Sequence, residues 1–129
     1  MRYLVDSSAY SLAQKGTEEA MRCFSEADLL VVTPVVLGEL RFGFSAGTKV
    51  NENKRLLAEF LQSDRAQIVP ITEETSHHYA AIRNSLRAAG TPISPNDVWI
   101  SASAMQHGLT VLTADRDFKK VSQILVELL

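Results

Sequence analysis

The fold is decided by the stretch Tyr3-Leu4-Val5-Asp6-Ser7-Ser8, in which a short apolar run passes directly into residues that favour a turn and a helix start. Similar apolar runs return at residues 29–32 (LLVV) and 110–113 (TVLT). Continuous rather than alternating apolar runs are typical of strands that are buried on both faces of a parallel sheet. Shorter strands are predicted at residues 68–71, around a proline, and at residues 124–126.

Helical periodicity fills the segments between these runs. Pro34 occupies the expected first position of a helix that continues to about Ala46. The stretch Ser94-Pro95-Asn96-Asp97 combines an N-cap serine, a first-turn proline and an acid three residues after the cap, which predicts a helix as far as His107. Strands that alternate with helices predict an α/β domain. We therefore expect a central, mainly parallel sheet of about five strands, covered on both faces by six or seven helices.

Length and composition fit one ordinary globular domain over residues 1–129. The chain is 46% apolar and 22% charged, and its single cysteine, Cys23, excludes an internal disulfide framework. The longest apolar stretch, residues 29–40, is interrupted by polar residues and is too short to span a bilayer. These features favour a cytoplasmic protein with no membrane segment. A net charge of −2 argues against a passive nucleic-acid coat, because such proteins are normally basic.

Acidic residues stand at the points where a parallel α/β sheet binds its ligands. Asp6 and Asp115 directly follow predicted strands, and Asp97 lies in the first turn of a helix. Glu39 lies in an otherwise apolar helix start, where a buried carboxylate needs a partner. Each acid also has a purely structural interpretation: Asp6, Asp97 and Asp115 could cap helices, and Glu39 could reach solvent at the edge of its helix.

Convergence of these four acids would require that they be protonated or occupied by cations. Two unit charges that are 4 Å apart repel by about 4 kcal/mol at an effective dielectric constant of 20. Hard oxygen ligands select Mg²⁺ or Mn²⁺, whereas zinc prefers histidine or cysteine. A divalent metal beside a phosphodiester is a hydrolytic arrangement.

Four segments carry a family resemblance: Asp6-Ser7-Ser8, Glu39 within residues 36–40, Asn96 to Ala102, and Leu112 to Phe118. Together they resemble the motifs of PIN-domain ribonucleases, and most closely those of the VapC-type toxins of prokaryotic toxin–antitoxin pairs. The resemblance extends from Leu4 to about Val126. One departure is that the family often has Thr and Asn after its first Asp, where this chain has two serines.

The resemblance implies a three-layer α/β/α domain that cleaves RNA with one or two divalent ions, Mg²⁺ or Mn²⁺. It implies that the catalytic and metal-binding residues are Asp6, Glu39, Asp97 and Asp115. Asp117 is a candidate fifth ligand, although on a helical turn its side chain could point away. Ser7, Asn96 and Thr113 would orient carboxylates or water.

The resemblance also implies two protein partners, a second copy of the chain and a small VapB-like antitoxin. The antitoxin's basic C-terminal segment could occupy the acidic groove. The residues themselves support a protein-binding surface, because Phe42 and Phe44 point in different directions on their helix and one of them should be exposed.

Two alternatives remain at this stage. The first is a PIN-like module that has lost turnover and only binds RNA or a partner protein; the intact set of acids argues against it. The second is a receiver-like signalling domain, which usually has an acid at the end of a middle strand and a lysine after a late one. Residues 29–32 are not followed by an acid, and no lysine follows Leu112 directly, so this alternative ranks low.

Overall fold

Five short strands form one sheet in the computed structural model, which describes residues 1–129. The spatial order is β3-β2-β1-β4-β5, and every neighbouring pair is parallel. Leu4 at the centre is aligned with Val31 on one side and Val111 on the other. The strands are β1 (Arg2–Val5), β2 (Leu29–Val32), β3 (Ala66–Ile68), β4 (Thr110–Thr113) and β5 (Leu125–Leu128).

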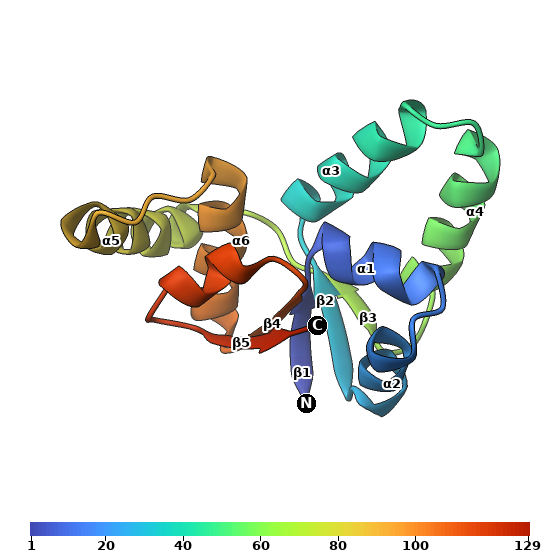
Figure 1. Ribbon diagram of the computed structural model, residues 1–129, viewed down its shortest axis with the longest axis horizontal. Helices are drawn as coiled ribbons and strands as arrows, with labels where there is room; N and C mark the ends of the chain where they lie inside the picture. Colours follow the sequence, from blue (N-terminus) through green and yellow to red (C-terminus); the bar gives the residue numbers. More distant parts are fainter.

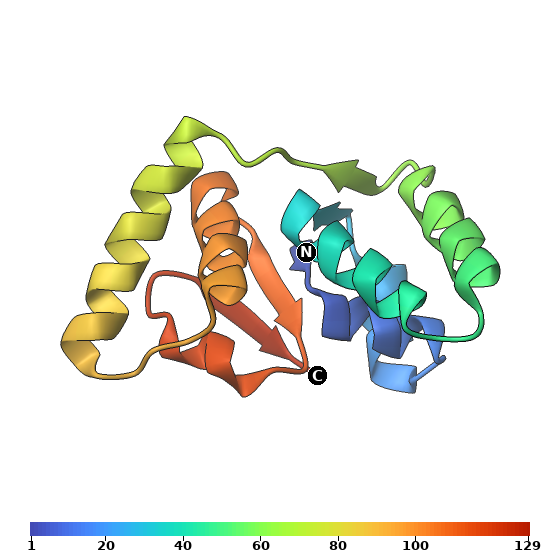
Figure 2. The same ribbon diagram turned by 90° about the horizontal axis from the view of Figure 1, so that it is seen from above.

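Six α-helices and one 3₁₀ helix cover this sheet, so the predicted three-layer α/β/α architecture is confirmed. Helices α1 to α4 lie on the side of β2 and β3, and helices α5 and α6 lie on the side of β4 and β5 (Figures 1 and 2). The helices are α1 (Ser7–Gln14), α2 (Glu18–Glu26), α3 (Pro34–Ser45), α4 (Val50–Leu61), α5 (Glu73–Ala89), α6 (Pro95–His107) and the 3₁₀ helix η1 (Arg116–Lys120).

The order of the strands creates a switch point beside β1. The chain steps outward from β1 to β2 and β3, and then returns to add β4 on the other side of β1. Loops that leave β1 and β4 therefore diverge, and in parallel α/β sheets this is where ligands bind. Asp6 directly follows β1, and Thr113 is the last residue of β4.

The core is continuous beneath this edge of the sheet. Leu4, Val5, Val31 and Leu112 are essentially inaccessible to solvent, as the continuous apolar runs predicted. A smaller apolar cluster, which includes Ile82 and other buried residues, joins α5 to α6. Because Ile100 of α6 belongs to the main core and Val98 to the smaller cluster, the start of α6 is held in a fixed place relative to the sheet.

Two predicted strands have wrong boundaries, because β3 covers Ala66–Ile68 rather than 68–71 and β5 covers Leu125–Leu128 rather than 124–126. The third strand ends at Ile68, before Pro70, because proline has no N–H to donate to the neighbouring strand. The last strand begins at Leu125 and continues to Leu128, beyond the predicted 124–126. None of the helices has the length and apolar character that crossing a membrane would demand.

Candidate active site

Asp6 is held rigidly between the first strand and the first helix. It is the N-cap of α1, and one carboxylate oxygen, Oδ1, accepts hydrogen bonds from the Ala9 N–H at 2.9 Å and the Ser8 hydroxyl at 2.7 Å. The other oxygen accepts a hydrogen bond from the Thr113 hydroxyl at the end of β4. The side chain is only 5% exposed. Burial raises the pKa of Asp6, and the hydrogen bonds oppose that rise.

Thr113 connects Asp6 to the next acid of the site. Its Oγ1 accepts a hydrogen bond from the Asp115 N–H at 2.9 Å while its hydroxyl hydrogen points to Asp6. Asp115 then caps η1, and its Oδ1 accepts the Asp117 N–H at 2.9 Å. The tight 3₁₀ turn brings Asp117 back toward Asp115. The carboxylate of Asp117 also pairs with Lys120 Nζ at 2.9 Å.

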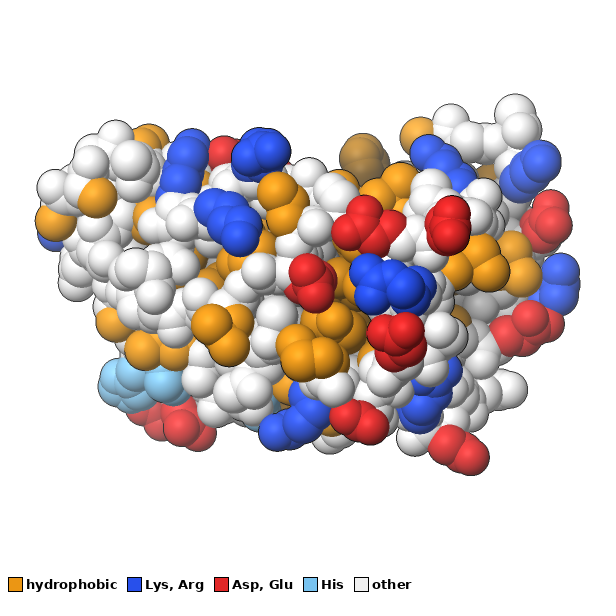
Figure 3. Space-filling view, turned by 60° about the horizontal axis from the view of Figure 1, so that its bottom comes forward, with side chains coloured by type: hydrophobic (Ala, Val, Ile, Leu, Met, Phe, Trp, Pro, Cys, Tyr) orange, Lys and Arg blue, Asp and Glu red, His pale blue; other side chains and the backbone are white.

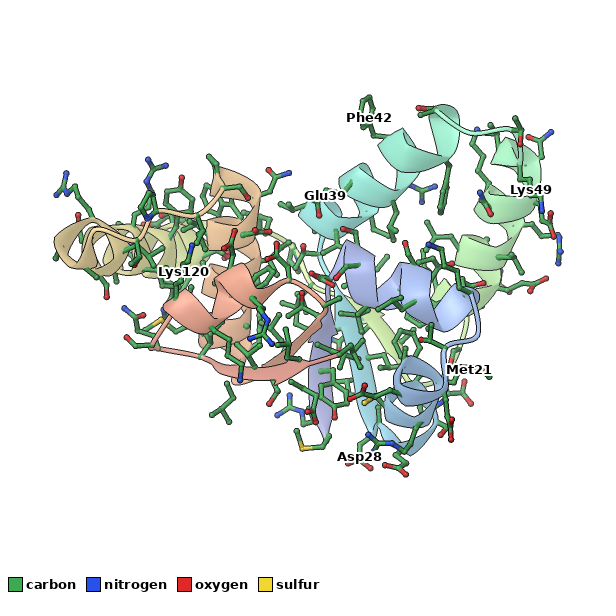
Figure 4. All side chains as sticks on the ribbon, in the orientation of Figure 1. Met21, Asp28, Glu39, Phe42, Lys49 and Lys120 are labelled. Carbon is green, nitrogen blue, oxygen red and sulfur yellow. The ribbon has the colours of Figure 1, made fainter.

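Glu39 enters the site from α3. The helix starts with Thr33 as its N-cap and Pro34 in its first turn, which places Glu39 one turn further along, facing the region between α1 and α6 (Figure 4). Its Oε1 accepts a hydrogen bond from the Ser7 hydroxyl, and its Oε2 accepts one from the Asn96 amide, both at 3.3 Å. The partners of this carboxylate are therefore a hydroxyl and an amide, rather than a cation.

Asp97 is contributed by the first turn of α6. Ser94 caps this helix by accepting the Asp97 N–H at 3.2 Å, as the sequence predicted. The carboxylate of Asp97 is half-buried. One oxygen each from Asp97, Asp115 and Asp117 lie within 4.8 Å of one another.

The site concentrates negative charge. The pKa of Asp97 is raised to about 6, first by burial of the carboxyl and then by the negative charges of Asp115, Glu39 and Asp6. All four predicted acids are therefore close enough to interact electrostatically. Asp6 and Glu39 border the tightest group of carboxylates, which consists of Asp97, Asp115 and Asp117.

The direction of the Asp117 side chain, which the sequence left open, is toward Asp97 and Asp115. A residue that the prediction missed is Ser8. Its hydroxyl bonds to Asp6, and the same oxygen accepts the Ala114 N–H at 3.0 Å, which joins α1 to the end of β4. Its position two residues after a capping aspartate was the available signal.

The chemistry of the donor set fits a hard divalent cation. The clustered ligands are carboxylate oxygens, with no cysteine or histidine among them. Only Lys120 forms an ion pair with a member of the group. The pKa of Asp97 is raised chiefly by burial, and the neighbouring carboxylates add to the rise. A bound cation would relieve the repulsion among these carboxylates.

These features define the class of protein. A model of the PIN domain matches residues 3–124, so the chain belongs to the PIN-domain family. Ribonuclease VapC4 of Mycobacterium tuberculosis strain H37Rv is 34% identical over 93 residues, which is 72% of each chain.

Solved structures of toxin–antitoxin complexes share the fold. One of them is the VapBC2 complex of Rickettsia felis, bound to a DNA fragment from its promoter. A chain of that complex aligns with 100% of this chain over 99% of its own length, with a TM-score of 0.86 and 23% sequence identity. The VapBC-5 complex of M. tuberculosis matches over 100% of both chains, with a TM-score of 0.76 and 25% identity.

Proposed function

We propose that this protein is a divalent-metal-dependent endoribonuclease and the toxin of a VapBC-type toxin–antitoxin pair. One observation carries the proposal: acids from four separated segments meet at the switch point of a PIN-domain sheet. The kinship to a ribonuclease VapC supports RNA as the substrate. Residues 1–129 would act as one domain, and the place of action would be the cytoplasm.

Asp6, Glu39, Asp97 and Asp115 are the proposed catalytic and metal-binding residues, with Asp117 as a fifth ligand. When bound, Mg²⁺ or Mn²⁺ would activate water and neutralise charge that develops on the phosphodiester. The ion is the family's expected cofactor, and the carboxylate set suits it.

The remaining polar residues fix the orientation of these carboxylates. Thr113 holds one oxygen of Asp6 through its hydroxyl, and Ser7 and Asn96 hold the two oxygens of Glu39. Because the carboxylates of Asp6 and Glu39 are held before any ion arrives, these two side chains need little reorganisation on binding. These three residues act on the cleaved bond only through the acids that they position.

The proposed protein partners are a VapB-like antitoxin and a second copy of the chain. Solved relatives are complexes named VapBC, which supports an antitoxin. Phe42 on α3 is 78% exposed and projects away from the fold (Figure 4), whereas Phe44 packs against the core. An exposed phenylalanine this close to Glu39 would suit an interface of either kind.

Cleavage of total RNA by the purified, antitoxin-free protein tests the proposal. We expect discrete fragments with Mg²⁺ or Mn²⁺, and none in EDTA. Asp6→Asn and Asp97→Asn should abolish cleavage, while Asp64→Asn, which changes an exposed acid on a turn, should not. A folded wild-type protein that binds RNA without cutting it in either metal would favour the silent binding module instead.

A further inference from the structure

A cavity outside the acidic cluster is formed where α5 meets the start of α6. It has a volume of about 490 Å³, within the roughly 300–1,000 Å³ that is usual for small-ligand sites. Its apolar wall is made by Leu86, Ile93 and Val98, and its polar rim by Arg83, Asn84 and Arg87. None of these residues has a role in the site described above.

The two arginines at the rim are free to bind an anion. Arg83 donates to the Tyr79 hydroxyl at 2.7 Å, and Arg87 donates to the Asn84 side-chain oxygen at 3.1 Å. Neither guanidinium pairs with a carboxylate, and both are exposed. A guanidinium with spare donors is well suited to a phosphate. Figure 3 shows a group of Lys and Arg side chains at its upper left, between the end of the molecule that α5 forms and the centre.

An aromatic side chain also lines the cavity. Tyr79 stacks against Trp99 with ring centroids 4.1 Å apart, and the Arg83 guanidinium lies 5.7 Å from the centre of the tyrosine ring. This stacking holds the Tyr79 ring in a fixed position beside the apolar wall of the cavity and the two arginines at its rim. Aromatic rings and guanidinium planes beside positive charge are the features with which proteins bind unstacked bases of single-stranded RNA.

The cavity and the acidic cluster share one structural element. Val98 lines the cavity, and the preceding residue, Asp97, belongs to the cluster. Ile93 likewise lies next to Ser94, the N-cap of the same helix. A strand of RNA with a phosphate at the acids would therefore have neighbouring nucleotides within reach of the cavity.

From this arrangement we propose that the α5–α6 cavity is a subsite for one nucleotide of the single-stranded RNA substrate, next to the bond that is cut. The base would enter the apolar cavity beside Tyr79, and Arg83 and Arg87 would bind its phosphate. The inference rests on the proposed ribonuclease function. The subsite would supply attraction that the acidic cluster, in a chain of net charge −2, does not provide.

Binding of a fluorescein-labelled single-stranded RNA oligonucleotide of mixed sequence, followed by anisotropy in EDTA, tests the subsite. The double variant Arg83→Gln, Arg87→Gln should bind about tenfold or more weakly than wild type. The slope of log affinity against log salt should fall in magnitude by about 0.7 for each arginine that contacts a phosphate. Arg22→Gln on α2, which pairs with Glu26, is the matched control and should change neither quantity.

A second variant separates the base from the phosphate. Ala80 lines the cavity and is exposed, so Ala80→Phe would fill the cavity without disturbing the core. It should weaken binding severalfold and leave the salt slope unchanged. If both the arginine variant and the Ala80 variant bind RNA with wild-type affinity, the subsite proposal is wrong. Cleavage of RNA by the wild type in the same preparation would still support the proposed nuclease function. If wild type neither binds nor cuts RNA, the function and the subsite both fail.

The same variants distinguish RNA from a protein occupant. Sedimentation of the wild type, the double arginine variant and Ala80→Phe at equal concentration reports self-association. We expect the three proteins to have the same oligomeric state. Loss of self-association together with unchanged RNA affinity would assign the cavity to a contact between copies and overturn the proposal.

Discussion

The Thr113 hydroxyl donates a hydrogen bond to the Asp6 carboxylate across the switch point between β1 and β4. The two residues are separated by 107 positions in the chain, and the bond is buried. Thr113 Oγ1 also accepts the Asp115 N–H, so one side chain fixes two of the proposed metal ligands. The site is therefore built by the pairing of two strands, and its geometry depends on the stability of the sheet.

Replacement of Thr113 by valine should damage both stability and activity. Valine keeps the shape and removes both hydrogen bonds, which leaves Asp6 and the Asp115 N–H short of a partner. We expect a loss of about 1–3 kcal/mol in the free energy of unfolding, measured by urea denaturation. Thr113→Ser keeps the hydroxyl and should retain most of both properties. Equal stability of the valine variant and wild type would contradict this role.

Asp97 should make the metal-free protein less stable as the pH rises. Its folded pKa of about 6 lies above the value of about 3.9 for an unfolded aspartate. The proton is thus held more tightly in the folded state, and this stabilisation is complete below about pH 4 and lost as the pH rises through about 6.

Asp97→Asn should remove this pH dependence. In EDTA at pH 7.5 we expect the variant to be more stable than wild type by about 1 kcal/mol, after allowance for screening by solvent. At pH 4 the two proteins should unfold at similar urea concentrations. Added Mg²⁺ should stabilise wild type more than the variant. A variant that is less stable than wild type at pH 7.5 in EDTA would argue against a raised pKa of the Asp97 carboxyl.

Much of the fold could be predicted from local sequence. Continuous apolar runs located the three central strands, and Ser94 with Pro95 located the start of α6, because these signals act within a few residues. The boundary of the strand at Pro70 was missed because it depends on hydrogen bonding to a neighbouring strand. Local sequence indicates helix starts well and the edges of a sheet poorly.

For the candidate site, the sequence indicated which acids to examine but not how they are held. The neighbouring sequence offers no cation dedicated to Glu39, and its actual partners, Ser7 and Asn96, come from two other elements. The direction of the Asp117 side chain was likewise set by a 3₁₀ turn and by Lys120. Such contacts arise only when distant segments pack together.

Arg65 should stabilise the protein through the end of a helix rather than through an ion pair. Its guanidinium donates to the Phe24 and Ala27 carbonyl oxygens, each at 2.7 Å, where α2 ends. A cation at a helix C-terminus is favourable, and these carbonyls have no other helical partner. Arg65→Ala should lower the free energy of unfolding by about 1–2 kcal/mol. Arg22→Ala, which removes an exposed ion pair, should cost less than Arg65→Ala.

Phe42 should matter for association and not for folding. Because its side chain is 78% exposed, Phe42→Ser should change the free energy of unfolding by less than about 0.5 kcal/mol. Phe44→Ser should be clearly destabilising, since Phe44 packs against the core. Sedimentation and antitoxin-binding measurements should show weaker association for Phe42→Ser. Unchanged association in both assays would remove Phe42 from any interface.

Calorimetric titration of the protein with Mn²⁺ at pH 7.5 tests most directly whether acids from four segments form one cation site. Wild type should bind Mn²⁺, and Asp97→Asn and Glu39→Gln should each weaken binding about tenfold or more. Asp64→Asn, outside the site, should bind like wild type. If wild type binds no Mn²⁺, or if all four proteins bind it equally well, the carboxylates at the switch point are not a metal site and the account is wrong.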